Sequence, residues 1–330
     1  MDIDWTKIDK VLIVQPENPD GDSVASALAL EEILGDLGKQ VHLYSYVHIP
    51  EYLGYISGFD RISDLFPGKF DLTIVVDTVT ASLLENTLSG GRLSAINGEG
   101  RQALILDHHP TENDLPLTNA VFYGGEGDCV STGEIVYHLA IKNKWKVNQA
   151  AATHIVESML ADTLGLNTEA VGPQAFRVVA DMLDAGANMA DIDKRRREFM
   201  KKPPEVITYK GTLLQRVEYL CDGKLAMVHI PWDEIQRISP HYNPSVLALE
   251  ELRNAEGVEL IVALKSYPDG KITGKLRANS LPIAGDLAAH FGGGGHAYAA
   301  GFKVHDWTIS DIRTEIIKHA TNLVSKLKIN

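Results

Sequence analysis

Residues 103–110 read ALILDHHP, and this stretch decides the expected fold. The apolar run ALIL is typical of a short buried strand, and Asp107, His108 and His109 follow it directly. Polar groups at the end of such a strand face the crevice where open α/β sheets bind ligands. His108 can offer a ring nitrogen to a metal ion, while Asp107 orients an imidazole and His109 stays available for the ligand of the metal. The stretch therefore predicts an α/β sheet with a metal site at its edge.

Further apolar runs predict the rest of a first sheet. Short strands are expected at residues 10–14, 41–44 and 72–76. Helices are expected from a cap at Asp22 or Ser23 to about residue 37, and at 131–143, 150–160 and 173–185. Strands that alternate with helices indicate a parallel sheet covered by helices.

The length of 330 residues predicts two domains. After a basic stretch at 194–202, strands are expected at 224–230, 258–264 and 271–276, with helices near 205–217, 245–254 and 309–327. We therefore expect a catalytic metal-binding domain at 1–190, a connector at 191–207 and a smaller substrate-binding α/β domain at 208–330. The active site is expected in the cleft between the domains.

The composition narrows the class of protein and of partner. The chain has 44 acidic and 31 basic residues and a net charge of −13, which argues against binding of long duplex nucleic acid. The chain has only 2 cysteines, so a framework of disulfide bonds is not expected. A reducing cytoplasm is therefore the expected location. The sequence has no signal-peptide pattern and no apolar run long enough for a membrane span. No membrane partner is expected, and a homodimer is left open.

Carboxylates follow other predicted elements as well. Asp20 and Asp22 lie in the loop NPDGDS, Asp77 ends the strand at 72–76, and Asp162 ends the helix at 150–160. Each alone is also compatible with a helix cap or a turn. Close carboxylates repel one another unless a cation lies between them. Together with His108 they predict a two-metal site for phosphoryl transfer, in which Asp77 bridges the ions.

A glycine run marks the second half of the chain. Residues 291–301 read FGGGGHAYAAG, and successive glycines leave backbone amides open as a nest for phosphate oxygens. We expect Gly293, Gly294, Gly295 and His296 to bind substrate; a flexible turn is the alternative. Arg277 is expected to bind phosphate with its guanidinium group, or else to be a surface charge.

In chain order, the motifs NPDGDS, VVDT, DHHP, ADT and GGGGHAYAAG resemble those of the DHH phosphoesterase family with its DHH-associated C-terminal domain. The resemblance spans residues 18–301. It implies hydrolysis of phosphodiester or phosphoanhydride bonds with two divalent ions, manganese being expected and magnesium the alternative. By this resemblance Asp20 and Asp77 hold one ion, and Asp22, Asp77, His108 and Asp162 hold the other. His109 contacts the scissile phosphate, while Arg277, the glycine run and His296 bind the far end of the substrate.

The chain departs from the family at one metal position. Members carry a histidine four residues before the first Asp of this loop, where this chain has Pro16. Glu17 or Gln15 would have to replace it. The expected activity is hydrolysis of short oligonucleotides or (cyclic) dinucleotides to mononucleotides. The alternatives are a nucleoside bisphosphate phosphatase and a weakened nucleotide-binding sensor.

Overall fold

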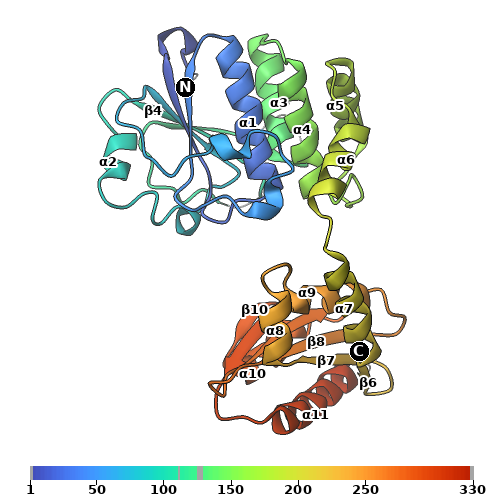
Figure 1. Ribbon diagram of the computed structural model, residues 1–330. Helices are drawn as coiled ribbons and strands as arrows, with labels where there is room; N and C mark the ends of the chain where they lie inside the picture. Colours follow the sequence, from blue (N-terminus) through green and yellow to red (C-terminus); the bar gives the residue numbers. More distant parts are fainter. Residues whose placement is uncertain (1–2, 111, 125–128, 328–330) are drawn as a thin grey trace. The chain divides into compact units, whose positions relative to one another are not determined.

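The computed structural model describes residues 3–110, 112–124 and 129–327, with the backbone alone for 323–327. The chain divides into two compact units, Met1–Lys201 and Lys202–Asn330 (Figure 1). Each unit has its own sheet and its own buried core. The predicted α/β architecture, a parallel sheet followed by a smaller α/β unit, is confirmed. In the described residues, no helix combines the length and the apolar composition that a membrane span needs.

The first unit is built on a five-stranded parallel sheet in the order β2-β1-β3-β4-β5. Its strands are β1 (Lys10–Val14), β2 (Gln40–Tyr44), β3 (Leu72–Val76), β4 (Gln102–Leu106) and β5 (Ala120–Tyr123). The four strands expected from apolar runs are confirmed, and β1, β3 and β4 are almost entirely buried. The sequence does not predict β5, because this edge strand alternates between exposed and half-buried residues and has no apolar run.

Helices cover this sheet. They are α1 (Gly21–Asp36), α2 (Arg92–Ile96), α3 (Thr132–Asn143), α4 (Gln149–Asp162), α5 (Pro173–Asp184) and α6 (Met189–Phe199). Short 3-10 turns occur at Trp5–Lys7, Glu51–Leu53, Phe59–Arg61 and Ala81–Leu83. The expected cap of the first helix is wrong, because Asp20 is the N-cap and forms a capping box with Ser23. The helix thus begins before Asp22, so the carboxylate of Asp22 does not cap it.

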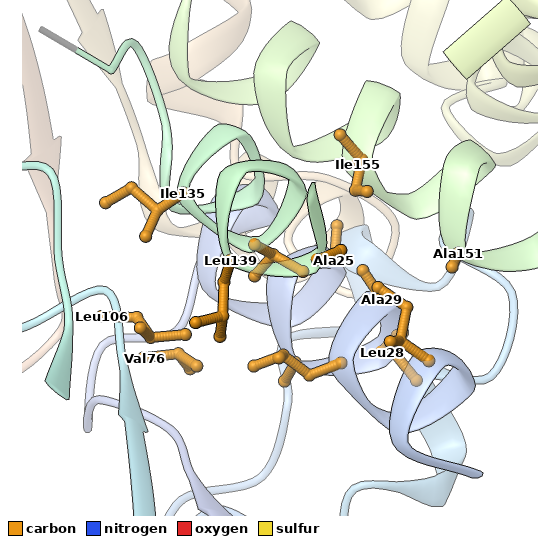
Figure 2. Close-up of a cluster of buried hydrophobic side chains, with 14 of the residues drawn as sticks. Ala25, Leu28, Ala29, Val76, Leu106, Ile135, Leu139, Ala151 and Ile155 are labelled. Atoms are coloured by element: carbon orange, nitrogen blue, oxygen red, sulfur yellow. The ribbon is translucent and has the colours of Figure 1, made fainter. Parts of the chain in front are cut away.

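Helices α1, α3 and α4 pack closely against one another (Figure 1). Every residue of α1 from Gly21 to Leu30 is buried, because the helix is enclosed by the sheet and by its two neighbours. Alanines such as Ala25 and Ala29 allow the close approach. Figure 2 shows this core, to which the helices contribute Leu28, Ile135, Leu139, Ala151 and Ile155 and the sheet contributes Val76 and Leu106. The packing fixes the start of α1 and α3 relative to the strand ends.

The second unit has a six-stranded mixed sheet in the order β10-β11-β9-β8-β7-β6, in which β7 and β8 are the parallel pair. Its strands are β6 (Glu218–Leu220), β7 (Leu225–Ile230), β8 (Leu260–Ser266), β9 (Ile272–Ala278), β10 (Gly294–His296) and β11 (Ala299–Val304). Its helices are α7 (Pro204–Gln215), α8 (Trp232–Ile238), α9 (Pro244–Leu252), α10 (Ala284–His290) and α11 (Ile309–Leu327). One face of the sheet packs with α7, α8 and α9, and the other packs with α10 and α11. The sequence predicts the three central strands but not β10 and β11, whose glycines indicate a loop.

The basic stretch expected as a connector is largely helical. Residues 189–199 form α6, which belongs to the first unit, and α7 begins at Pro204. Arg195 donates to the buried carboxylate of Glu157 on α4 at 2.9 Å, and Arg197 pairs with Asp193 within α6. Only residues 200–203 lie between the two helices. Two arginines of this basic stretch thus form ion pairs within the first unit. A basic composition alone does not distinguish such a helix from a linker.

Gly211→Ala should stabilise the second unit. Gly211 is exposed in the middle of α7, and a Cβ built there meets no atom within 4 Å. Glycine in a helix interior costs about 0.5–1 kcal/mol relative to alanine. We expect the free energy of unfolding to rise by about that amount, measured by urea denaturation. A decrease would show that the helix is not formed as described.

Candidate metal centre

The carboxyl ends of β1, β3 and β4 lie at one edge of the parallel sheet. In this strand order the ligand-binding crevice of an α/β sheet lies beside β1 and β3. Asp162 reaches the same place as the last residue of α4. The Nε2 atom of His108 lies 3.5 Å from Oδ2 of Asp22, 3.7 Å from Oδ1 of Asp77 and 3.6 Å from Oδ2 of Asp162. The structure thus brings together four of the predicted site residues.

The N-terminus of α3 holds the carboxylate of Asp22. The N–H of Thr132 donates to Oδ2 at 2.8 Å and that of Gly133 to Oδ1 at 3.4 Å. The hydroxyls of Ser158 and Ser26 donate to Oδ1 at 2.5 and 3.0 Å. These donors and the helix N-terminus favour the anion. Burial acts in the opposite direction, is the largest effect, and raises the pKa of Asp22.

Asp77 ends β3 in a left-handed conformation, with φ of 59°. Such a φ is rare outside glycine, and aspartate is one of the residues that tolerate it. Its N–H donates to the carbonyl of Leu106 at 2.8 Å, and its Oδ1 accepts from the hydroxyl of Thr132 at 3.1 Å. Burial, followed by the charges of Asp22 and Asp20, raises the pKa of Asp77 well above its ordinary value. Without a cation, ionised Asp77 therefore destabilises the fold.

Asp107 orients His109 rather than His108. The Nδ1 atom of His109 lies 2.7 Å from Oδ1 of Asp107, and its backbone N–H donates to the same oxygen at 3.2 Å. This hydrogen bond raises the pKa of the His109 imidazole. The His109 side chain is 48% exposed and that of His108 is 11% exposed. One histidine therefore faces inward to the carboxylates, while the other is accessible to a substrate.

The residues present fit a divalent metal ion. The ligand atoms of Asp22, His108 and Asp162 lie within 4.8 Å of one another, as do those of Asp77, His108 and His109. Nε2 of His108 is buried and, among the described residues, has no hydrogen-bond partner. A buried unpaired ring nitrogen among carboxylates costs free energy unless a cation joins them. Ligand atoms around a small divalent ion are separated by about 3 Å, close to the spacing observed here.

Asp20 is placed differently from the other acids. Its Oδ1 accepts from the N–H groups of Asp22 and Ser23 at 3.0 Å, so this oxygen caps α1. Among the described residues it belongs to neither of the two ligand groups. Its charge nevertheless raises the pKa of Asp77, and the side chain is exposed. Its role as a metal ligand stays a prediction.

The two residues considered as substitutes at Pro16 are both engaged elsewhere. The carboxylate of Glu17 accepts from the side chain of Asn86 at 2.7 Å and from the N–H of Thr87 at 2.8 Å. The amide nitrogen of Gln15 donates to a backbone carbonyl of α1 at 3.1 Å. Oε1 of Gln15 is buried and has no hydrogen-bond partner among the described residues. Among the described residues, the side-chain oxygen of Gln15 thus accepts no hydrogen bond, whereas both carboxylate oxygens of Glu17 accept one.

The glycine run of the second unit makes backbone contacts of its own, and its role as a phosphate nest stays a prediction. The N–H groups of Gly292 and Gly293 donate to carbonyls at the end of α10, each at 2.9 Å. Residues 294–296 form β10, paired with β11. A Cβ at Gly293 would lie 2.3 Å from the carbonyl oxygen of Gly301, and one at Gly295 would lie 2.6 Å from that of Ala299. Close strand packing therefore requires these glycines.

Arg277 lies on β9 and His296 on β10, the two strands that flank β11 in the sheet. Both pair in register with Ala299 of β11, Arg277 from β9 and His296 from β10. Nη1 of Arg277 donates to the carbonyl of Leu276, and the side chain of His296 is exposed. No ion pair of Arg277 occurs within the described part of the chain. The structure thus places these two predicted substrate-binding residues on either side of β11, opposite the same residue, and their role in substrate binding stays a prediction.

The sequence analysis missed the polar groups that hold the carboxylates. They are Ser26, Ser131, Thr132, Gly133 and Ser158, all buried or within buried helix ends. The STGE motif at 131–134 predicts a helix cap, and Ser131 does accept from the N–H of Glu134 at 3.2 Å. The same helix end also faces Asp22 and Asp77. Only the fold reveals that second use, because α1, β3 and α3 are far apart in sequence.

Thr132→Val should weaken the centre without unfolding the unit. It removes the hydroxyl that donates to Asp77 and keeps the amide that donates to Asp22. Loss of a group that orients a metal ligand costs about 10–100-fold in metal affinity or activity. We expect a loss in this range, measured as the manganese concentration that gives half-maximal activity. Thr153→Val on α4, where the hydroxyl donates to the carbonyl of Gln149 in the same helix, is the control, and equal effects in both variants would contradict the assignment.

Comparisons with known proteins identify the family and the fold. Residues 10–164 match the DHH family, N-terminal domain, and residues 236–326 match the DHHA1 domain. The bifunctional oligoribonuclease and PAP phosphatase NrnA of Thermus thermophilus is 25% identical over 88% of this chain and 83% of its own. The protein of the same name from Bacillus subtilis is 23% identical over 92% of each chain. An exopolyphosphatase-related protein from Bacteroides fragilis has the same fold, with a TM-score of 0.75, 19% identity, and coverage of 97% of this chain and 95% of its own.

A parallel sheet whose strand ends gather carboxylates around an unpaired imidazole, followed by a smaller α/β unit, defines a metal-dependent phosphoesterase. The chain belongs to the DHH phosphoesterase family. The resemblance drawn from its motifs is confirmed.

Proposed function

We propose that this protein is a phosphodiesterase that hydrolyses short oligonucleotides or (cyclic) dinucleotides to mononucleotides with two manganese ions. The observation that carries the proposal is the Nε2 atom of His108, unpaired and within 3.5–3.7 Å of three carboxylate oxygens. The oligoribonuclease names of the two NrnA relatives support the substrate class. The net charge of −13 favours a short substrate over a long duplex.

The proposed division of labour follows the contacts of each side chain. Asp22, Asp77, His108 and Asp162 hold one ion, while Asp20 and Asp77 hold the other. Bound divalent ions would supply an activated water and balance the charge on the leaving oxygen. Asp107 keeps Nδ1 of His109 engaged, so Nε2 of this exposed imidazole is free to donate to a phosphoryl oxygen. The raised pKa of His109 favours its protonated, donating form.

A groove in the second unit supports recognition of an anionic substrate. It has a volume of about 540 Å³ and is lined by Lys265, Lys275, Lys303 and Gly293, among others. The three cations share one groove beside the glycine run. We propose that they bind phosphate groups of the substrate away from the reacting bond, together with Arg277, Gly294, Gly295 and His296.

Lys265 should make substrate binding depend on pH. Burial, followed by the charge of Lys275, lowers the pKa of Lys265 to about 8. Its positive charge is therefore present below pH 8 and lost as the pH rises through that value. A hydrogen bond between charged groups contributes about 1.5–3 kcal/mol, so we expect KM for a dinucleotide to rise about tenfold between pH 7 and 9. Lys265→Arg stays charged and should flatten this rise; an unchanged profile would exclude Lys265 from binding.

Hydrolysis of a nucleoside bisphosphate is the second candidate activity, supported by the PAP phosphatase half of the relatives' names. Steady-state assays with linear diadenylate and with PAP, both with manganese, compare the two activities directly. The main proposal expects a higher kcat/KM for the dinucleotide. A higher value for PAP would replace it with the phosphatase.

A nucleotide-binding sensor is the third candidate, because Pro16 cannot bind metal. Metal analysis of the purified protein separates a sensor from an enzyme. Two manganese ions per chain, together with turnover, support catalysis. One ion or none, with a nucleotide bound but not hydrolysed, would support the sensor.

A further inference from the structure

A second cluster of metal-ligating side chains lies at the start of α3, apart from the centre described above. Cys129 precedes the helix, and Glu134 and His138 are one helical turn apart on it. One ligand atom from each lies within 4.8 Å of the others: a sulfur, a carboxylate oxygen and a ring nitrogen. Spacing between the two cysteines of the chain gives no sign of this cluster, because its other members are not cysteines.

The side chains of Glu134 and His138 in this cluster are buried and incompletely paired. The Glu134 side chain is 2% exposed and that of His138 is 12% exposed. Oε2 of Glu134 accepts from the N–H of Val130 at 2.8 Å, while Oε1 lies 3.8 Å from Nε2 of His138. That nitrogen is buried and has no hydrogen-bond partner within the described residues. A buried polar atom without a partner costs about 1–3 kcal/mol, and a cation between the two side chains would remove this cost.

The donor set selects a particular kind of cation. Thiolate, imidazole and carboxylate together suit zinc, whereas oxygen-rich sites suit manganese and magnesium. In tetrahedral zinc sites with bonds of about 2.0–2.3 Å, neighbouring ligand atoms are roughly 3.3–3.8 Å apart. The separation of 3.8 Å between His138 and Glu134 falls within this range. A water molecule would complete the tetrahedron.

We propose that Cys129, Glu134 and His138 bind a zinc ion. On binding, the thiol of Cys129 loses its proton to solvent and the sulfur becomes a ligand. Zinc would then join the segment before α3 to the first turns of that helix. Between these ligands lies Thr132, whose N–H and hydroxyl hold Asp22 and Asp77. The site would therefore fix the helix end on which the metal centre depends.

Cobalt substitution tests this proposal independently of any enzymatic activity. Cobalt(II) bound to a thiolate gives a ligand-to-metal absorption band in the near ultraviolet. The metal centre at the strand ends has no sulfur ligand, so the band reports on a cysteine outside that centre. The full chain, purified under reducing conditions and freed of metal, would be titrated with cobalt chloride. We expect a saturable band that zinc chloride abolishes by displacement.

The two cysteines provide matched variants. Cys129→Ser should eliminate the band, Cys221→Ser should keep it, and His138→Gln should weaken cobalt binding at least tenfold. Circular dichroism establishes that each variant is folded, and His138→Gln serves as the decisive variant if Cys129→Ser does not fold. Absence of the band in the wild type, its survival in Cys129→Ser, or unchanged affinity in His138→Gln would overturn the proposal. Each of these results leaves the proposed phosphodiesterase activity untouched.

Discussion

Asp77→Asn is expected to lower manganese-dependent hydrolysis of a dinucleotide about 1,000-fold. Asp77 lies between the proposed ions, and its carboxylate is one of three near Nε2 of His108. Metal ions contribute several kcal/mol to stabilisation of the transition state, and each 1.4 kcal/mol corresponds to about tenfold in rate. The measurement is kcat under saturating manganese, with bound manganese determined on the same sample. We expect the variant to lose most of its manganese as well.

The same variant should be more stable than the wild type when no metal is bound. Burial and neighbouring charges raise the pKa of Asp77, so the ionised carboxylate destabilises the folded state at neutral pH. Asparagine removes this charge and can still accept from the hydroxyl of Thr132. A higher Tm together with lost activity would separate a functional residue from a structural one.

Asp71→Asn is the matched control, because Asp71 precedes the other end of the same strand. Its Oδ2 accepts from the N–H groups of Asp9 and Lys10, at 3.0 and 2.8 Å, far from the carboxyl ends of the strands. This variant should keep its activity and its manganese. Full activity in Asp77→Asn would exclude Asp77 from the metal centre.

Gly133→Ala is expected to reduce both stability and activity. A Cβ at this position would lie 2.2 Å from Oγ and 2.6 Å from Cβ of Ser158, and 3.3 Å from the carbonyl oxygen of Ile155. Because α4 is packed on both sides, α3 must move instead. Overpacking of this kind costs about 1–3 kcal/mol. The displaced N-terminus would carry its amides away from Asp22, and we expect activity to fall about 10–100-fold.

Gly35→Ala is the control for this prediction, since Gly35 is exposed in α1 and a Cβ there meets no atom within 4 Å. A second variant, Gly133→Ala combined with Ser158→Gly, tests the cause. Removing the Ser158 side chain should restore part of the stability but not the activity, because its hydroxyl donates to Asp22. Unaffected stability in Gly133→Ala would show that α3 and α4 do not cross as described.

Much of the first unit can be predicted from the sequence, because buried parallel strands appear as short apolar runs. The polar residues that directly follow these strands all lie at the same edge of the sheet. The same reasoning predicts that Asp22, Asp77 and His108 lie together, and the structure places them side by side. The sequence does not predict β5, whose side chains are half exposed, or the true cap of α1. Residues whose function depends on tertiary packing leave no local pattern.

Thr132 and the glycine run illustrate this limit in opposite directions. Thr132 is an ordinary residue of a helix end, and its contacts with two distant carboxylates arise only when α1, β3 and α3 pack together. The run from Gly292 to Gly295 indicates a phosphate nest, yet strand pairing and helix termination account for its glycines. A glycine run is compatible with several backbone roles, and its amide partners distinguish them.

The most direct test is anomalous diffraction from a crystal soaked in manganese chloride, recorded at the manganese absorption edge. We predict a strong anomalous peak at bonding distance from Nε2 of His108 and from carboxylate oxygens of Asp22, Asp77 and Asp162. No manganese at these four side chains, at concentrations that support turnover, would contradict it.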